Sequence, residues 1–206
     1  AMNDSEMNDI GNSYDKICEQ WYDFRKNTKI NRCVAEFSEL LRPGSKVLDV
    51  GCGTGYPISA YLVGRGFTVT GIDISERMIE KARRLELKSA SFLVRDLLNF
   101  HPSEKYDAVI AFDSLWHISH ERQREIYAVV SALMNIDGYF LFTHGNKDGS
   151  IIGEMFGERF YHSALDLKEV HALLAACGFS VLSSVENYQE ETTGDRGLLV
   201  IAKKTA

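Results

Sequence analysis

Short apolar segments and segments of helical periodicity alternate along most of this chain. Between the apolar segments, hydrophobic residues recur every three or four positions, as on the buried face of a helix, over 55–65, after Ser75 and after Ser119. Because strands that alternate with helices form βαβ units, we expect a parallel sheet with helices on both faces. The apolar segments that predict its strands cover residues 46–50, 67–72, 91–94, 106–112 and 138–143.

The beginning of the chain departs from this alternation. Two helices are predicted before the first strand, an aromatic-rich one over 10–25 and a second from Ile30 to Leu41, where Pro43 and Gly44 stop it. We therefore expect residues 1–45 to form an N-terminal helical cap and residues 46–206 to form one α/β domain.

The end of the chain predicts a hairpin. Asp166 and Glu169 form a capping-box pair that begins a last helix. Two strands follow this helix, at 179–185 and 198–203, with no crossover helix between them. They should pair as an antiparallel hairpin at the sheet edge. The expected sheet therefore has seven strands and is mostly parallel.

Composition and charge narrow the function classes. The chain has 206 residues, 45% of them hydrophobic and 25% charged, which is typical of a soluble globular domain. A net charge of −6 does not supply the basic surface that binds a phosphate backbone, so we expect no nucleic-acid partner. We also expect no membrane partner, because no apolar run approaches roughly 20 residues. The N-terminal residues 1–9 are polar and acidic, unlike a signal peptide.

The cysteines are scattered rather than paired. No C-x-x-C spacing occurs, so the sequence predicts neither a zinc site, nor any other metal site, nor a disulfide framework. Free thiols suit a reducing cytosol, and we expect a cytoplasmic protein. The four residues are Cys18, Cys33, Cys52 and Cys177.

A glycine-rich turn follows the first strand. In the segment VLDVGCGTG, Gly51, Gly53 and Gly55 alternate with other residues, Cys52 among them, directly before a helix. Glycine lets a ligand lie against the backbone, and a helix N-terminus attracts anionic groups. A dinucleotide fold requires G-x-G-x-x-G instead. Asp49, at the strand end, would also repel a pyrophosphate, so the loop favours a cationic ligand without phosphate.

Carboxylates follow the next two strands. Asp73, in GIDIS, stands where nucleotide-binding sheets bind ribose hydroxyls, although NAD proteins use the same device and a capping role is the alternative. Asp96, in RDLL, could accept a hydrogen bond from an adenine amine while Leu97 packs on the ring. Ile74 and Met78 would complete an apolar adenine slot.

These segments, with YDAVIAFDSLWHI, resemble the class I S-adenosylmethionine-dependent methyltransferases over about residues 10–204. The closest resemblance is to the small bacterial group called type 11 or ubiquinone/menaquinone-like. The resemblance implies a Rossmann-like sheet, S-adenosylmethionine as cofactor and S-adenosylhomocysteine as product. It assigns the glycines to the methionine and ribose, residues 111–113 with Phe112 to the methionine end, and Tyr14 and Tyr22 to a segment over the cofactor. Packing between helices is the alternative for these two tyrosines. The N/D-P-P-Y/F motif of enzymes that methylate amino groups is missing.

The acceptor is less well specified. His117 and His144 follow the fourth and fifth strands and are candidate bases, with a pocket-shaping role as the alternative. The long stretch 146–165 carries apolar residues, and we interpret it as an acceptor lid. Its character favours a small, partly hydrophobic acceptor. The residues expected to contact this acceptor are Trp21, Trp116, His117, His144 and Tyr161.

Two other functions compete with methyl transfer. A non-catalytic module that binds S-adenosylmethionine would show the same cofactor residues. An NAD(P)-dependent oxidoreductase would use a similar sheet, but the glycine spacing and Asp49 oppose it.

Overall fold

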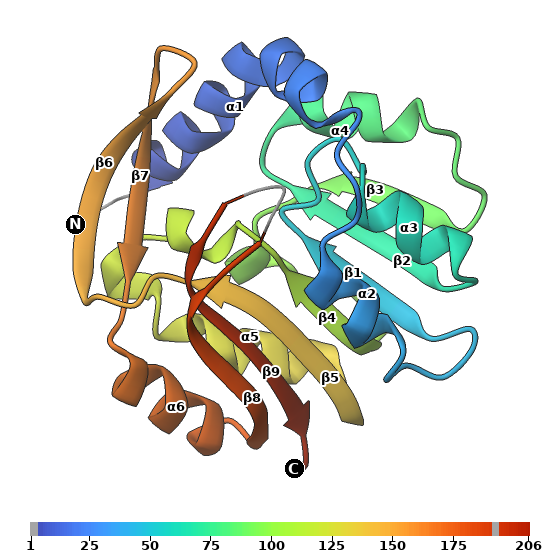
Figure 1. Cartoon of the computed structure of the whole chain (residues 1–206), viewed down its shortest axis with the longest axis vertical. Helices are drawn as coiled ribbons and strands as arrows, with labels where there is room; N and C mark the ends of the chain where they lie inside the picture. Colours follow the sequence, from blue (N-terminus) through green and yellow to red (C-terminus); the bar gives the residue numbers. More distant parts are fainter. Residues whose placement is uncertain (1–3, 191–193) are drawn as a thin grey trace.

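A computed structural model describes residues 4–190 and 194–206 of the chain (Figure 1). The first three residues of the expected N-terminal cap lie outside the described residues. Within the described part, seven strands form one sheet in the order β3-β2-β1-β4-β5-β9-β8. Their bounds are β1 Lys46–Val50, β2 Thr68–Asp73, β3 Ala90–Val94, β4 Tyr106–Ala111, β5 Met134–His144, β8 Phe179–Tyr188 and β9 Arg196–Lys204.

The pairing confirms the expected fold class. Strands β1 to β5 are parallel to one another, whereas β9 runs antiparallel to β5 and to β8. The last two strands thus form the antiparallel hairpin expected at the sheet edge. The helices are α1 Asp4–Arg25, α2 Arg32–Ser38, α3 Ile58–Gly64, α4 Glu76–Arg83, α5 Glu125–Leu133 and α6 Leu167–Ala176, with short 3-10 turns η1 Leu97–Asn99, η2 Leu115–His117 and η3 His120–Arg122.

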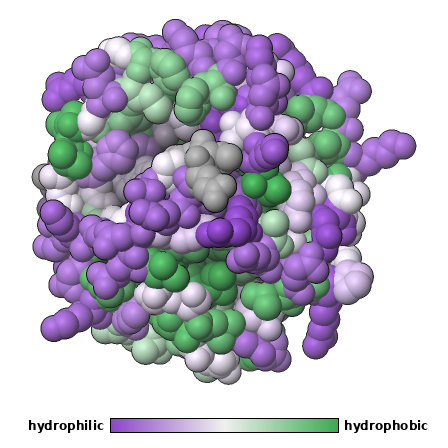
Figure 2. All heavy atoms as spheres, in the orientation of Figure 1, coloured by the Kyte–Doolittle hydropathy of each residue, from purple (hydrophilic) through white to green (hydrophobic). Residues whose placement is uncertain are grey.

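Two apolar cores hold helices on both faces of the sheet. Phe37 of α2 and Leu62 of α3 belong to the core on one face, together with Val47 of β1. On the other face, α5 and α6 bury their apolar sides against residues that include Phe140 and Phe142. Each strand supplies side chains to both cores, because successive side chains of a strand point to opposite faces of the sheet. On the face seen in Figure 2, polar side chains predominate and apolar patches lie between them.

Local capping residues act where the sequence predicts. The Ser75 side chain accepts a hydrogen bond from the backbone N–H of Met78 at the start of α4. Asp166 accepts one from the N–H of Glu169 at the start of α6. Two helices begin later than expected: α3 starts at Ile58 rather than at residue 55, and the segment after Ser119 forms η3 before α5.

The stretch expected to be an acceptor-lid loop has regular structure. It forms an antiparallel hairpin of β6 Gly149–Met155 and β7 Glu158–Ala164. Phe156 and Gly157 make its two-residue turn, both with positive φ. The hairpin lies beside α1 (Figure 1), and Phe160 packs against Ile10 and Ile17 of that helix. A hairpin therefore corrects the expected loop, and its role as a lid stays a proposal.

Candidate functional site

An open cavity lies at the carboxyl ends of β1, β2, β3 and β4 and beneath α1. Ligands in open parallel sheets bind at this edge. The cavity brings together residues from the glycine turn, from the ends of four strands and from α1. Those expected from the sequence that line it are Tyr14, Trp21, Asp49, Gly51, Cys52, Gly53, Asp73, Ile74, Met78, Asp96, Leu97, Phe112 and His117.

The glycine turn is held against the sheet at the base of this cavity. The N–H groups of Gly51 and Cys52 both donate to the carbonyl of Ile72 on β2. Gly51 has φ +69°, and a Cβ there would lie 2.3 Å from the Cβ of Ser114. Two features therefore exclude a side chain at Gly51: the positive φ of its backbone and the lack of space beside Ser114.

Asp49 is a buried acid behind the turn. Its carboxylate accepts a hydrogen bond of 2.6 Å from the Ser59 hydroxyl. Burial raises the pKa of Asp49 to about 7, with a smaller contribution from the neighbouring charge of Asp73 in the same direction. A cation brought into the cavity would favour the ionised form of this group.

Asp73 links the turn to the start of α4. Its Oδ2 accepts from the N–H of Gly53 at 2.9 Å, and its Oδ1 accepts from the N–H of Ser75 at 2.9 Å. Burial raises its pKa. A carboxylate has about four lone-pair sites, so each oxygen retains capacity for a ligand hydroxyl.

Asp96 caps a turn and also lines the cavity. Its Oδ1 accepts from the N–H of Leu98 at 3.3 Å, and its Oδ2 accepts from the side-chain amide of Asn99 at 2.7 Å. The neighbouring Leu97 is buried on the cavity wall. Asp96 is thus oriented by its own turn, which leaves part of its acceptor capacity for a ligand amine.

Two residues expected at the cofactor lie elsewhere. Tyr22 is outside the cavity lining, with its ring 4.4 Å from the Nζ of Lys81 on α4. Gly55 is also outside the lining, and a Cβ there would meet the side chains of Leu85 and Phe92 at 3.1 Å. Gly55 therefore serves the packing of the turn on β3 rather than a ligand surface.

Three residues expected at the acceptor also lie outside the lining. The Trp116 ring meets the His117 ring edge to face and lies tilted against the His162 ring. Tyr161 uses its hydroxyl to accept from the N–H of His120. His144 is fully buried on the side of the sheet that carries Phe142, and hydrogen-bonds Gln123. Of the two candidate bases, the structure brings His117 to the cavity and keeps His144 away from it.

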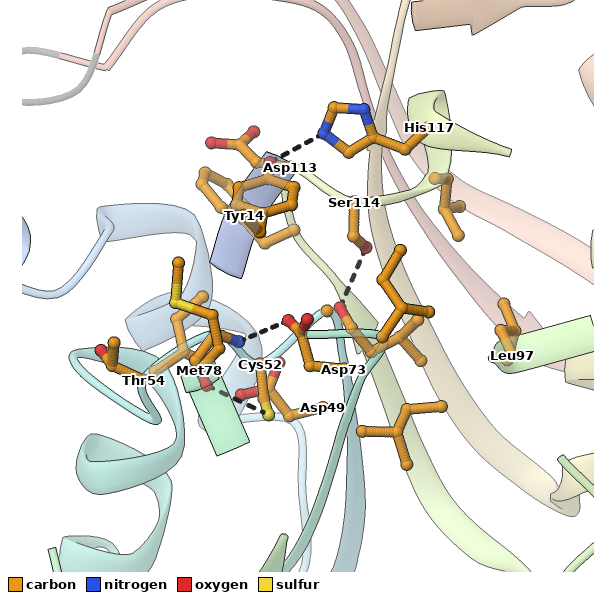
Figure 3. Close-up of a pocket in the computed structure, with 18 of the residues that line it drawn as sticks. Tyr14, Asp49, Cys52, Thr54, Asp73, Met78, Leu97, Asp113, Ser114 and His117 are labelled. Carbon is orange, nitrogen blue, oxygen red and sulfur yellow. Dashed lines mark hydrogen bonds between the residues drawn. The ribbon is translucent and has the colours of Figure 1, made fainter. Parts of the chain in front are cut away.

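The buried His117 and the partly buried Tyr14 form a pair in the cavity wall (Figure 3). The Nε2 of His117 lies 2.8 Å from the Tyr14 hydroxyl, and its Nδ1 lies 2.8 Å from the backbone carbonyl of Tyr161. Because a carbonyl can only accept, Nδ1 carries the proton and donates. Burial lowers the pKa of His117 to about 3, so the ring is neutral and Nε2 accepts from Tyr14. Burial raises the pKa of Tyr14, which keeps its hydroxyl protonated.

An arginine that sequence reasoning missed also lines the cavity. Arg25, at the end of α1, is 8% exposed and stacks over the Trp21 ring at 5.4 Å. Among the described residues, none hydrogen-bonds or ion-pairs with its guanidinium. Burial lowers its pKa, partly offset by the nearby carboxylate of Asp113. Helical spacing could have identified it, because residues 14, 21 and 25 fall on one helix face.

A second missed feature is an ion pair behind Phe112. Arg196 of β9 donates to both carboxylate oxygens of Asp113, at 2.9 and 2.5 Å, and stacks over the Phe112 ring. Thr143 of β5 also bonds to Asp113. The pair fixes the loop after β4, and no local sequence pattern joins residues 83 positions apart.

Part of the chain matches a known protein family, and curated proteins are similar to it in sequence. Residues 47–138 match a family described as "Methyltransferase domain". A ubiquinone biosynthesis O-methyltransferase from Thiobacillus denitrificans is 29% identical over 147 residues, covering 66% of this chain and 62% of that protein. The chain thus spans less than two thirds of this relative's length.

Solved structures share the fold over nearly the whole chain. Magnesium protoporphyrin IX methyltransferase from Synechocystis PCC 6803, solved with S-adenosylmethionine bound, has a TM-score of 0.74 at 20% identity, covering 100% of this chain and 99% of that one. The [4+2]-cyclase SpnF has a TM-score of 0.76 at 16% identity, covering 97% of each chain. At these identities the likeness establishes the fold alone. Within residues 4–190 and 194–206, no helix is long and apolar enough to cross a membrane.

Proposed function

We propose that the chain is a class I S-adenosylmethionine-dependent methyltransferase, as its fold and the domain match at residues 47–138 support, and that it transfers a methyl group to a small-molecule acceptor. One observation carries the proposal. Acidic side chains at the ends of three neighbouring strands, Asp49, Asp73 and Asp96, line a single cavity with the glycine turn. A cofactor with a cationic centre, a ribose and an adenine meets all three.

The described residues fit this cofactor. Asp73 would hold the ribose hydroxyls with the lone pairs left free by Gly53 and Ser75. Asp96 would accept from the adenine amine, with Leu97 against the ring. When bound, the cofactor supplies an electrophilic methyl group on a sulfonium. The chain contributes binding, alignment and exclusion of water, which can account for much of a displacement reaction's acceleration.

Arg25 supplies the charge that the methionine end would need. Its guanidinium is more than nine-tenths buried, lines the cavity and has no hydrogen-bonding partner among the described residues. A buried charge without a partner is costly, and a carboxylate would relieve that cost by a charge-assisted bidentate bond. We propose that Arg25 binds the cofactor carboxylate while Asp49 faces its amino group.

We further propose an acceptor smaller than a macromolecule. The net charge of −6 opposes a nucleic-acid acceptor. Aromatic rings of Tyr14, Trp21 and Phe112 line the cavity, which supports a partly apolar ligand.

Calorimetric titration tests the cofactor assignment. We expect S-adenosylmethionine and S-adenosylhomocysteine to bind and NADH not to bind. In Arg25→Met, S-adenosylhomocysteine should lose about 2 kcal/mol of binding free energy, as for a hydrogen bond to a charged group. The decarboxylated cofactor should bind wild type and variant alike, which is the matched control. Binding of NADH without any response to either sulfur compound would refute the proposal.

A further inference from the structure

We propose that Tyr14 and His117 together accept the proton of a hydroxyl acceptor, with the Tyr161 carbonyl holding the imidazole in the required tautomer. This inference rests on the proposed function and adds to it the chemical class of the acceptor. It starts from the hydrogen bonds that join the helix α1, the turn η2 and the hairpin strand β7 at one cavity wall.

The direction of each hydrogen bond follows from its partners. The Tyr161 carbonyl accepts from Nδ1 of His117, so Nε2 presents a lone pair. Tyr14 must then donate its hydroxyl proton to Nε2 across 2.8 Å. The phenol oxygen keeps two lone pairs, and Tyr14 lines the cavity. A hydroxyl placed there would donate to Tyr14, whose own proton already points at a base.

The proton transfer balances. As the acceptor oxygen bonds to the methyl carbon and the sulfur–methyl bond breaks, the acceptor O–H proton passes to the Tyr14 oxygen. The proton of Tyr14 passes at the same time to Nε2 of His117. Tyr14 ends neutral, and His117 ends as an imidazolium that still donates from Nδ1 to Tyr161. A tertiary amine or a thioether brings no such proton and would leave the pair without a role.

The charged and titratable surroundings of the pair explain when it can accept a proton. His117 faces two titratable side chains, Tyr14 from α1 and His162 from β7. The centroids of the His117 and His162 rings are 4.8 Å apart, and a charge on His162 would lower the pKa of His117. The negative charges of Asp73 and Asp113 raise the pKa of Tyr14, and the positive charge of Arg25 lowers it. At this largely buried wall, a new positive charge on His117 is disfavoured while the bound cofactor is cationic. Loss of the sulfonium charge removes that opposition, so the positive charge moves within the cavity instead of being added to it.

Nuclear magnetic resonance on the intact chain tests this coupling without turnover. The His117 ring would be titrated in complex with S-adenosylmethionine and, separately, with S-adenosylhomocysteine. We expect the pKa of His117 to be about one unit higher in the complex with the neutral product, roughly a tenfold gain in proton affinity. Equal values in two saturated complexes would overturn the inference and leave the proposed function standing. Failure of both ligands to bind would instead overturn the proposed function.

Matched variants separate proton transfer from packing. Tyr14→Phe keeps the ring that packs on Phe160 but should shift the Nε2 resonance toward an unbonded nitrogen. The affinity for S-adenosylhomocysteine should stay within about twofold. Tyr127→Phe is the control, because the Tyr127 hydroxyl is buried without a hydrogen-bonding partner in the described structure, outside the cavity. An unchanged Nε2 resonance in Tyr14→Phe would contradict the assigned bond.

A screen of hydroxyl, amino and thiol compounds tests the acceptor class. We expect the methylated product to carry its methyl group on oxygen. For that product, kcat should fall about 100-fold in Tyr14→Phe and in His117→Gln. In His117→Gln, kcat should also no longer decrease at low pH, because the base that becomes protonated there is gone. Tyr127→Phe should match the wild type. A nitrogen- or sulfur-methylated product formed at the wild-type rate by His117→Gln would overturn the inference.

Discussion

Asp49→Asn should stabilise the ligand-free protein at high pH much more than at low pH. Asp49 is buried behind the glycine turn, and its folded-state pKa is raised from 3.8 to about 7. Because the folded protein holds the Asp49 proton more tightly than the unfolded chain does, proton binding at Asp49 adds to the free energy of unfolding. This contribution is complete below pH 3.8. It is lost progressively as pH rises through about 7. Asparagine cannot ionise, so its contribution does not change over this window.

The magnitude follows from the size of the shift. One pKa unit corresponds to about 1.4 kcal/mol, so the rise to about 7 amounts to about 4 kcal/mol over the whole window. Between pH 5 and pH 9 the unfolded carboxyl is already ionised, and about 3 kcal/mol of the effect remains. Burying the asparagine amide adds a cost of its own, but this cost is the same at both pH values and cancels in the comparison.

Urea unfolding of both proteins at pH 5 and pH 9 measures this difference. The gain in unfolding free energy for Asp49→Asn over wild type should be about 3 kcal/mol larger at pH 9. Ser59→Ala is an informative second variant, because it removes the 2.6 Å hydrogen bond that favours the ionised form. Its stability should fall further on raising the pH than that of wild type. An equal effect of Asp49→Asn at both pH values would refute a raised pKa at this site.

Four further substitutions test other contacts, one of them as a matched control. Asp73→Ala should weaken S-adenosylhomocysteine binding by about 1–3 kcal/mol in calorimetry, and unchanged affinity would place the ribose elsewhere. Gly51→Ala should destabilise the fold by about 3 kcal/mol or more, from positive φ and the 2.3 Å clash. Gly44→Ala, at φ +75° in open space, should cost about 1 kcal/mol in the same thermal unfolding assay; equal losses would contradict the steric reasoning. Arg196→Met should destabilise by about 3 kcal/mol, because it leaves Asp113 without its bidentate partner, and an unchanged midpoint in urea would contradict this.

The features predictable from the sequence are those encoded locally. Ser75 and Asp166 cap their helices as expected, because a cap depends on residues two or three positions away. The glycine turn, Asp73 and Asp96 each follow a strand directly, so the parallel topology alone brings them to one edge. The terminal hairpin follows from two strands with no helix between them.

Other placements depend on which face of an element a residue occupies. On α1, Trp21 lies seven residues after Tyr14 and shares its face, whereas Tyr22 is rotated by one residue toward α4 and Lys81. On β5, His144 follows Phe142 at the two-residue period and therefore enters the buried core. A strand end or an aromatic cluster alone does not bring a residue to the cavity, because the periodicity of the element assigns the face on which it lies.

Two features had no local signal. The β6–β7 hairpin turns at Phe156 and Gly157, both with positive φ, whereas the usual marker of such a turn is Asn-Gly or Asp-Gly. The Tyr14–His117 bond joins residues 103 positions apart, and its geometry exists only after α1 packs on the hairpin. Such contacts depend on tertiary structure, which no pattern within one element contains.

The charges in the cavity discriminate between ligands more sharply than the fold does. The same architecture belongs to a [4+2]-cyclase, so the sheet alone does not specify the chemistry. Asp113 is neutralised by Arg196, which leaves the three carboxyl groups of Asp49, Asp73 and Asp96 on the walls, where they outnumber the guanidinium groups of Arg25 and Arg95. A pyrophosphate would bring two negative charges to a wall that already repels them. A ligand with a sulfonium, an ammonium and one carboxylate instead offers a cation to the acidic side and an anion to Arg25, so electrostatics favours the methyl donor over a dinucleotide.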